Sequence, residues 1–193
     1  MSQPPGAITV LLGAAGDGDD DARNRLFTVL YEELHRLAHQ KLRHEGPACD
    51  RQTTSLVHDL FIRIAGGQNL SFANRQEFFA SAARAMEQIL VEDARKRLAK
   101  KRGAGKQPFQ LEFDPFGRDS DPEEILDVHD VLRRFEIVDG RRAAVVRYRF
   151  FAGMTGQETA EIMGISARSV DSDWQFARAW LHRELTKGRS RAS

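Results

Sequence analysis

The sequence predicts an all-α protein built from two small helical domains that a linker joins. Apolar residues recur at steps of three and four along most of the chain, which is the period of an amphipathic helix, and no run alternates as a half-buried strand does. The segment 103–122 interrupts this pattern with three glycines, three prolines and many charges. The 193 residues suffice for two compact halves. We therefore expect domains at 1–102 and 123–193 and a linker at 103–122.

Three helices are expected in the first domain. The first follows the acids at 19–21, which suit a helix N-terminus, and ends near Gly46 and Pro47. The second begins at a hydroxyl cap and stops at the glycine pair 66–67. The third extends from about 74 to 102 and carries a run of basic residues at its C-terminal end. The candidates for the hydroxyl cap are Thr53, Thr54 and Ser55.

The second domain is expected to contain helices at 123–138, 141–151, 157–163 and 166–185. A turn at Asp139 and Gly140 separates the first two of them. The second domain is therefore expected to be all-helical, like the first.

The composition indicates a globular protein that acts in the cytoplasm. Hydrophobic residues make up 41% and charged residues 30%, and no apolar run approaches the roughly 20 residues that a membrane span needs. The start lacks a basic segment ahead of an apolar core, so no secretory signal is expected. The single Cys49 excludes an internal disulfide framework and a cysteine-rich zinc site. We expect no cofactor.

The net charge of +1 conceals an uneven distribution. The stretch 95–106 is basic, 112–139 is predominantly acidic, and the chain beyond Gly140 is basic again. Such blocks create local fields that a total near zero does not show. The basic blocks are candidate surfaces for nucleic acid.

The segment 157–170 fits a helix-turn-helix. Ala160 is small where two helices approach closely, Gly164 can adopt a positive φ in the turn, and Ser166 can cap the second helix. That helix would direct a polar set toward a DNA major groove, with its last arginine nearer to phosphate. The set is Arg168, Ser169, Asp171, Ser172, Gln175 and Arg178. An ordinary helical hairpin in a bundle is the alternative.

Two carboxylates in this helix, Asp171 and Asp173, do not suit a DNA-binding surface because they repel phosphate. They can accept hydrogen bonds from cytosine amino groups, or they can face other side chains of the same domain.

Several further motifs accompany the helix-turn-helix in a fixed order. Leu-Val-His-Asp-Leu-Phe-Ile-Arg-Ile occupies 56–64, and Phe78-Phe79 leads into Arg84-Ala85-Met86 and the basic helix end. With the linker and the helix-turn-helix, this order over about 8–185 resembles a bacterial RNA polymerase sigma factor of the extracytoplasmic-function (ECF) type.

The resemblance implies that the chain works with core RNA polymerase, through its β′ and β subunits, and with promoter DNA. The second helix would dock on β′, the loop and helix at about 70–102 would melt and hold the downstream promoter element, and the last helix would read the upstream element as duplex. The implied docking residues are Val57, Asp59, Leu60 and Arg63. Those for the downstream element are Phe72, Asn74, Arg84, Gln88, Arg95, Lys96 and Arg97.

Three phenylalanines near the third helix are candidates for stacking on extruded bases. Phe78 and Phe79 have the spacing of core residues, whereas Phe72 precedes the helix in a loop-like position. Phe72 is therefore the better candidate.

The sequence departs from the family at 52–55, where family members usually carry an acidic stretch and this chain has Gln-Thr-Thr-Ser. A phosphate adds about −1.5 to −2 charge at neutral pH, and a helix N-terminus favours an anion. The chain also resembles the subgroup of these sigma factors that is activated by a serine/threonine kinase and is not held inactive by an anti-sigma protein. The sequence does not decide whether this chain has an anti-sigma partner. Thr54 is the first candidate for phosphorylation, followed by Thr53 and Ser55. The alternative is that these hydroxyls only cap the helix.

Two other function classes deserve comparison. A transcriptional repressor or activator with a helical dimerisation domain would share the helix-turn-helix but would not act through core polymerase. A metal-dependent phosphohydrolase would use the pairs His58-Asp59 and His129-Asp130 as metal ligands. The two pairs fall in different predicted domains, which argues against the enzyme, and no metal is expected.

Overall fold

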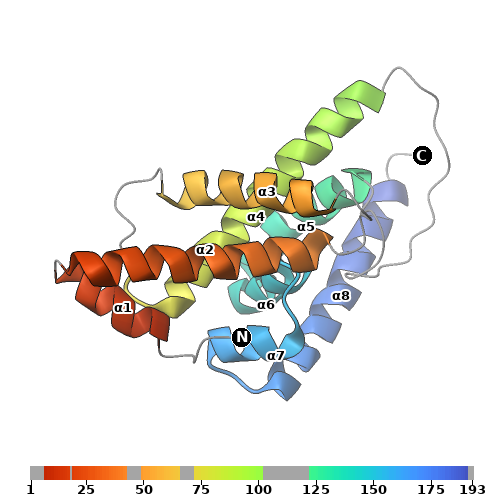
Figure 1. Cartoon of the computed structure of the whole chain (residues 1–193). Coiled ribbons are helices and arrows are strands. Elements are labelled where there is room, and N and C mark those ends of the chain that lie inside the picture. Colours follow the sequence, from red (N-terminus) through yellow and green to blue (C-terminus); the bar gives the residue numbers. More distant parts are fainter. Residues whose placement is uncertain (1–6, 18, 43–48, 66–71, 102–121, 191–193) are drawn as a thin grey trace. The chain divides into compact units, whose positions relative to one another are not determined.

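The computed structural model describes residues 7–17, 19–42, 49–65, 72–101 and 122–190. Over these residues the chain is helical and contains no strand, which confirms the all-α class (Figure 1). Its contacts divide the chain into two units, 1–85 and 86–193. The predicted linker lies outside the described residues except for Pro122, so its place as the domain boundary stays a prediction.

Unit 1 consists of α1 (Ala7–Gly16), α2 (Asp20–Leu42), α3 (Cys49–Ala65) and the first part of α4 (Arg75–Lys101). Helix α2 packs against both α1 and α3. The fully buried apolar side chains of this unit include Leu30, Leu34, Leu37, Val57, Leu60, Phe78 and Phe79. The unit is therefore organised around the apolar face of α2.

Helix α1 was not expected from the sequence. Its apolar residues form an almost unbroken run rather than a periodic stripe, so no polar face marks a surface helix. Ile8 and Leu12, one turn apart, are buried, whereas Val10 is 71% exposed. Packing against α2 thus selects the inner face of α1.

The predicted starts of α2 and α4 are confirmed. Asp19 Oδ1 accepts a hydrogen bond from Ala22 N–H (3.0 Å) ahead of α2. Asn74 Oδ1 accepts from Glu77 N–H (3.0 Å), and the Glu77 carboxylate in turn accepts from Ala73 N–H (2.7 Å). Both caps satisfy backbone donors that the first turn leaves unpaired.

The predicted start of α3 is wrong. This helix begins at Cys49, so Thr53, Thr54 and Ser55 lie inside it and do not cap it. No glycine or proline follows Pro47 before Ala65, and a hydroxyl residue is compatible with a helix interior. A phosphate at these positions would therefore not sit at a helix N-terminus.

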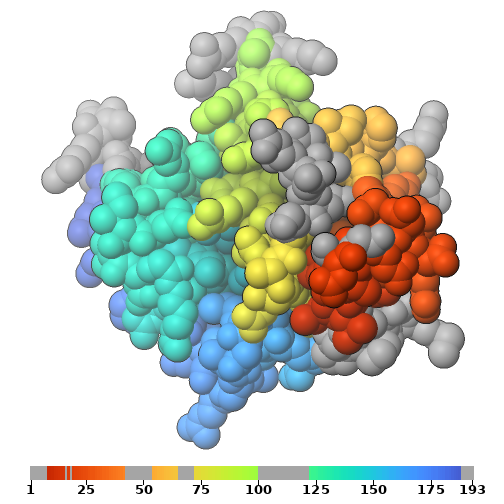
Figure 2. Space-filling model, turned by 90° about the vertical axis from the view of Figure 1, so that its left-hand side faces the viewer, coloured from red at the N-terminus to blue at the C-terminus, as the bar shows by residue number. Residues whose placement is uncertain are grey.

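Unit 2 contains α5 (Pro122–Val138), α6 (Gly140–Val146), α7 (Gly156–Met163) and α8 (Ala167–Ser190), together with the end of α4. Helix α8 packs against α5, α6 and α7, and Figure 2 shows the teal α5–α6 region adjoining the blue segment that follows it. The core includes Val91 and Ala94 of α4 with Leu132, Phe135, Phe151, Val170, Ala177 and Leu181. The Phe135 ring stacks on Trp180 at a centroid distance of 4.5 Å.

A π-helical turn, η2 (Arg147–Phe151), replaces the end of the helix predicted at 141–151. Ala152 N–H donates to Arg147 C=O (3.1 Å), one residue wider than an α-helical bond. The widened turn buries Arg147, Tyr148, Phe150 and Phe151 together. An apolar pattern does not distinguish a π turn from an α turn, so sequence reasoning missed it.

Arg147 and Glu87 form a buried charge cluster within unit 2. Arg147 Nε donates to Glu87 Oε2 (2.6 Å), and its Nη2 donates to Glu136 Oε2 (3.0 Å). The other Glu87 oxygen lies 2.8 Å from His129 Nδ1. Burial lowers the pKa of Arg147, but Glu87 and then Glu136 outweigh it, so that pKa lies above its ordinary value. The cluster joins the end of α4 to α5 and η2.

The core of unit 2 yields a stability prediction. Phe135→Ala should lower the free energy of unfolding by about 3–5 kcal/mol, because Phe135 is fully buried and the substitution leaves a cavity. Urea unfolding followed by fluorescence of Trp174 and Trp180 measures this, since both lie in α8. The matched control is Ile137→Ala: Ile137 is 89% exposed in the same helix and should change stability by less than about 0.5 kcal/mol. Equal effects of the two substitutions would contradict the packing.

Candidate nucleic-acid interface

A short turn joins α7 to α8 and sets their relative orientation. Gly164 adopts a left-handed conformation with φ of 65°, and Ile165 N–H donates to Ala160 C=O (3.1 Å). Ser166 Oγ then accepts a hydrogen bond from Ser169 N–H (3.1 Å) at the start of α8. These contacts confirm the roles predicted for Gly164 and Ser166.

The start of α7 is fixed in a similar way. Thr155 Oγ1 accepts from Glu158 N–H (3.2 Å), and Glu158 Oε2 accepts from Thr155 N–H (2.7 Å), which is a capping box. Both ends of α7 are therefore held by specific hydrogen bonds, and the helix cannot slide relative to the turn without losing them.

Helix α8 has a buried and an exposed side. Val170, Ala177 and Leu181 are fully buried, and Trp174 is 6% exposed. The opposite side carries Arg168, Ser172 and Gln175, spaced four and three residues apart and all exposed. Asp171 and Arg178 are also exposed. The structure thus brings five of the six predicted recognition residues to the outer surface of one helix.

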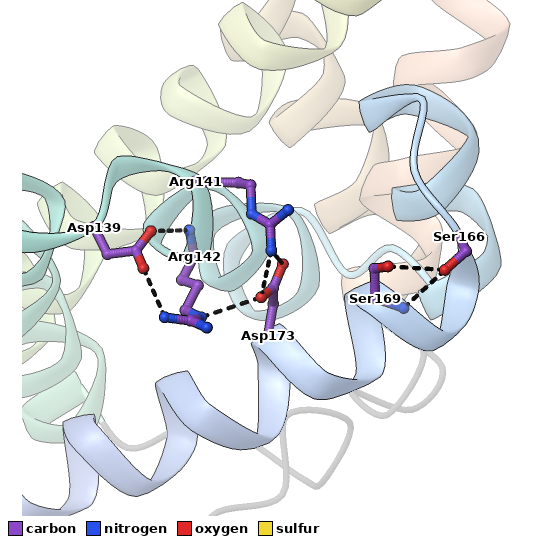
Figure 3. A network of polar contacts seen from close by, with 6 residues as sticks. All are labelled: Asp139, Arg141, Arg142, Ser166, Ser169 and Asp173. Atoms are coloured by element: carbon purple, nitrogen blue, oxygen red, sulfur yellow. Dashed lines mark hydrogen bonds and ion pairs between the residues drawn. The ribbon is translucent and has the colours of Figure 1, made fainter.

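Ser169 is the exception among these residues. It is half-buried, and its hydroxyl lies 2.8 Å from Ser166 Oγ while its N–H donates to the same oxygen (Figure 3). Its side chain therefore serves the start of α8 in this structure.

Asp173 faces other side chains of its own unit, which was one of the two alternatives for this carboxylate. It is 2% exposed. Its Oδ1 accepts from Arg141 Nη2 (2.8 Å) and from Arg142 Nε (3.1 Å), and its Oδ2 lies 2.7 Å from Arg141 Nη2 (Figure 3). Buried charge is tolerated when it is paired in this manner. Asp173 is therefore part of the α6–α8 contact.

Asp171 remains at the surface beside Arg149. Burial lowers the pKa of Arg149, and the charge of Asp171 partly opposes that effect. Gly156 gives the pair room, since a Cβ there would lie 2.6 Å from Arg149 Nη1 and 3.3 Å from Asp171 Oδ1. Asp171 thus has a basic neighbour within the protein.

The contacts of Arg141 and Arg142 with Asp173 were not predicted from the sequence. A signal was present: Asp173 lies three residues after Val170 and four before Ala177, both core positions, so its helix face predicts a buried acid. A buried acid requires basic partners. Which of the many arginines supply them is decided by packing.

The predicted downstream-element residues on α4 are exposed. Arg84, Gln88 and Arg95 follow one another at steps of four and seven, which places them on one face of the helix. Lys96 and Arg97 are exposed as well, with Arg97 Nη1 4.0 Å from Asp93 Oδ2. The surface at this end of α4 is therefore basic.

The phenylalanines around the start of α4 form an intramolecular stack. Phe78 and Phe79 are fully buried with centroids 5.1 Å apart, so they are core residues in this structure. Phe72 is half-buried and packs edge-on against Phe78 at 5.5 Å. Asn74 is exposed, but its side chain caps α4.

The four predicted docking residues lie on different faces of α3 and differ in exposure. Val57 and Leu60 are fully buried in unit 1, because they lie on the inner face of the helix. Asp59 is exposed and Arg63 is half-buried, while Ile62 is 53% exposed. Of the four predicted docking residues, Asp59 and Arg63 therefore reach the surface, and Val57 and Leu60 do not.

Among the described residues, no three histidine, cysteine, aspartate or glutamate side chains gather as a metal site, and His129 contacts Glu87. None of the described helices is both long and apolar enough to cross a membrane.

Comparison with known protein families identifies the family to which the chain belongs. The model of the ECF sigma factor family matches residues 5–187, nearly the whole chain. The chain belongs to the ECF sigma factor family. No match was found among curated proteins or among solved structures. This ECF sigma factor is thus an alternative sigma factor that directs transcription initiation, with core RNA polymerase and promoter DNA as its partners.

The turn of this sigma factor provides a second stability prediction. Gly164→Ala should lower the free energy of unfolding by about 1–2 kcal/mol, because a Cβ is unfavourable at φ of 65°. Gly164→Asn should cost less, since asparagine tolerates this conformation. Urea unfolding measures both.

The control for the turn is Gly140→Ala. Gly140 lies in α6, outside the positive-φ positions, and a Cβ there meets nothing within 4 Å. Its replacement should be neutral or stabilising. A loss at Gly140 as large as that at Gly164 would show that φ is not the cause.

Proposed function

We propose that this sigma factor recognises promoter DNA with the outer face of α8 and the exposed face of α4. The observation that carries the proposal is the division of α8 into a buried side and an exposed polar side that ends in arginine. A helix of this kind, preceded by α7 and a tight turn, matches the helix-turn-helix arrangement in which the second helix enters the major groove.

On α8 the side chains suit different parts of the upstream duplex. Arg168 has the geometry for a bidentate contact with guanine, and Gln175 for one with adenine. Ser172 lies between them on the same stripe. Asp171 can accept from a cytosine amino group, and Arg178 is placed for phosphate.

The exposed basic end of α4 is proposed to hold the downstream element. Arg84, Gln88 and Arg95 would contact one strand, and Lys96 and Arg97 would add phosphate contacts whose strength falls with salt. Phe72 is the remaining aromatic candidate for a base, provided that it leaves the edge of Phe78.

Docking on β′ is proposed to use the outer face of α3. Asp59 and Ile62 share that face with Ser55, at steps of four and three residues. Arg63 lies at its edge. The buried Val57 and Leu60 would act by holding α3 in place rather than by touching the partner.

The assignment of α8 can be tested with reconstituted holoenzyme. In vitro transcription with core polymerase and a genomic promoter library identifies the promoters that the holoenzyme uses. On these promoters, Arg168→Ala should weaken the binding free energy for the upstream element by about 1–3 kcal/mol and lower the transcript yield. The control is Arg133→Ala, which removes an exposed arginine from α5. Equal transcription by the two variants on every promoter would contradict the assignment, whereas operator binding without polymerase would favour a repressor.

Phosphorylation of α3 is proposed as a switch for docking, with Thr54 as the first site. Thr54 and Ser55 are exposed, whereas the side chain of Thr53 lies outside the described residues. Thr54 precedes the exposed His58 by one turn, so a phosphate there would stand on the solvent-facing side of α3. The added charge would stand where the family's acidic stretch is missing, and its source would be a cytoplasmic serine/threonine kinase.

The switch predicts that phosphothreonine installed at position 54, or Thr54→Glu, raises co-purification with core polymerase and transcript yield. Thr54→Ala should stay at the unmodified level. Thr28→Glu is the control, because Thr28 is exposed inside α2, another helix of unit 1. The same activity for all forms would eliminate the switch and leave Thr54 as an ordinary helix residue.

A further inference from the structure

The two arginines that contact Asp173 differ in how much of their side chains they bury. The Arg142 side chain is 31% exposed. Its Nε binds Asp173, its Nη1 donates to Asp139 Oδ2 (2.9 Å), and its guanidinium lies 4.1 Å from the Phe176 ring centre. Arg142 is therefore held on three sides by the protein.

Arg141 is held at one end only. Its side chain is 55% exposed, and its hydrogen bond to Asp173 uses Nη2. Among the described residues, the contact of Arg141 with Asp173 involves Nη2 alone and leaves Nε and Nη1 outside it (Figure 3). A guanidinium has five donors in a rigid plane, so pinning one nitrogen directs the others.

The position of Asp173 places Arg141 beside the outer face of α8. Ser169, Asp173 and Phe176 follow one another at steps of four and three, so they form a stripe that borders the stripe of Arg168, Ser172 and Gln175. Ser169 and Phe176 are partly exposed, and Asp173 is covered by the two arginines of α6. Arg141 thus stands at the flank of the surface assigned to the major groove.

We propose that Arg141 binds a DNA backbone phosphate beside the upstream element, with Asp173 as the residue that positions it. A helix lying in the major groove has a phosphate backbone along each side, and neighbouring elements of helix-turn-helix proteins contact it. The ligand is a phosphate rather than a base, because Arg141 comes from α6 and not from the outer face of α8.

The inference rests on the proposed DNA contact of α8 and adds a sequence-independent anchor to it. Asp139 and Asp173 offset the charges of Arg141 and Arg142 in the free protein, and the ion pair with Asp173 holds the half-exposed guanidinium of Arg141 in place before DNA binds. Preorganisation of this kind lowers the entropy lost on binding.

The test is the salt dependence of promoter binding by holoenzyme containing Arg141→Gln. On a duplex carrying a promoter from the transcription library, the slope of log affinity against log salt should become shallower by about one. Between 50 and 200 mM salt this amounts to a roughly threefold smaller loss of affinity than the wild type shows. Arg141→Lys should keep the wild-type slope because it retains the charge, and Arg133→Gln is the matched control.

A second measurement uses wild-type protein and duplexes in which single phosphates are replaced by neutral methylphosphonates. One position flanking the upstream element should weaken wild-type binding and have no further effect on Arg141→Gln. The effect should persist when the upstream bases are changed, as expected of a phosphate contact.

The outcomes separate this inference from the function on which it rests. If wild-type holoenzyme binds its promoter and Arg141→Gln keeps the slope of Arg133→Gln, the phosphate contact is refuted and the role of α8 stands. If no methylphosphonate position couples to Arg141, the contact is also refuted. If neither Arg168→Ala nor changes in the upstream bases weaken promoter binding, the proposed function of α8 fails, and this inference fails with it.

Discussion

Burial of one side of α8 is the constraint on which unit 2 depends. Val170, Ala177 and Leu181 pack against α5, α6 and α7, and Trp174 and Trp180 extend this contact along the helix. Because side chains three and four residues apart share a helix face, fixing the inner side also fixes the outer one. The exposed stripe of Arg168, Ser172 and Gln175 is thus a consequence of core packing.

Two buried carboxylates of this unit, Glu87 and Asp173, differ in how exposed their basic partners are. Glu87 pairs with Arg147, whose side chain is 9% exposed, and contacts His129, so its cluster joins helices without presenting an arginine to solvent. Asp173 is equally buried, but one of its partners, Arg141, is half-exposed. A buried acid with an exposed basic partner positions a cation at the surface at a known place, which a free surface arginine does not do.

Much of the helical layout could be predicted because its signals are local. The acids before Asp20, the cap at Asn74, the turn at Gly164 and the cap at Ser166 each depend on residues within one turn. Three features could not be predicted. The start of α3 was missed because hydroxyls are compatible with helix interiors, and α1 was missed because an unbroken apolar run has no period. The π turn at Arg147–Phe151 was missed because a widened turn leaves no pattern in the sequence. The candidate surfaces divide similarly: Arg168 and Arg84 are exposed as their helix positions suggested, whereas Val57 and Leu60 are buried.

The sequence by itself determined the all-α class, the turn at Gly164 between α7 and α8, the basic end of α4 and, through the order of its motifs, the sigma factor family. Tertiary structure alone decided that Asp173 faces Arg141 and Arg142, that Glu87 pairs with Arg147, and that Phe78 and Phe79 are core residues. The physical reason is the separation along the chain between the residues that interact. Periodicity, caps and turns are set by neighbours within about four residues, whereas the partner of a buried charge comes from another helix 31, 32 or 60 residues away in the chain.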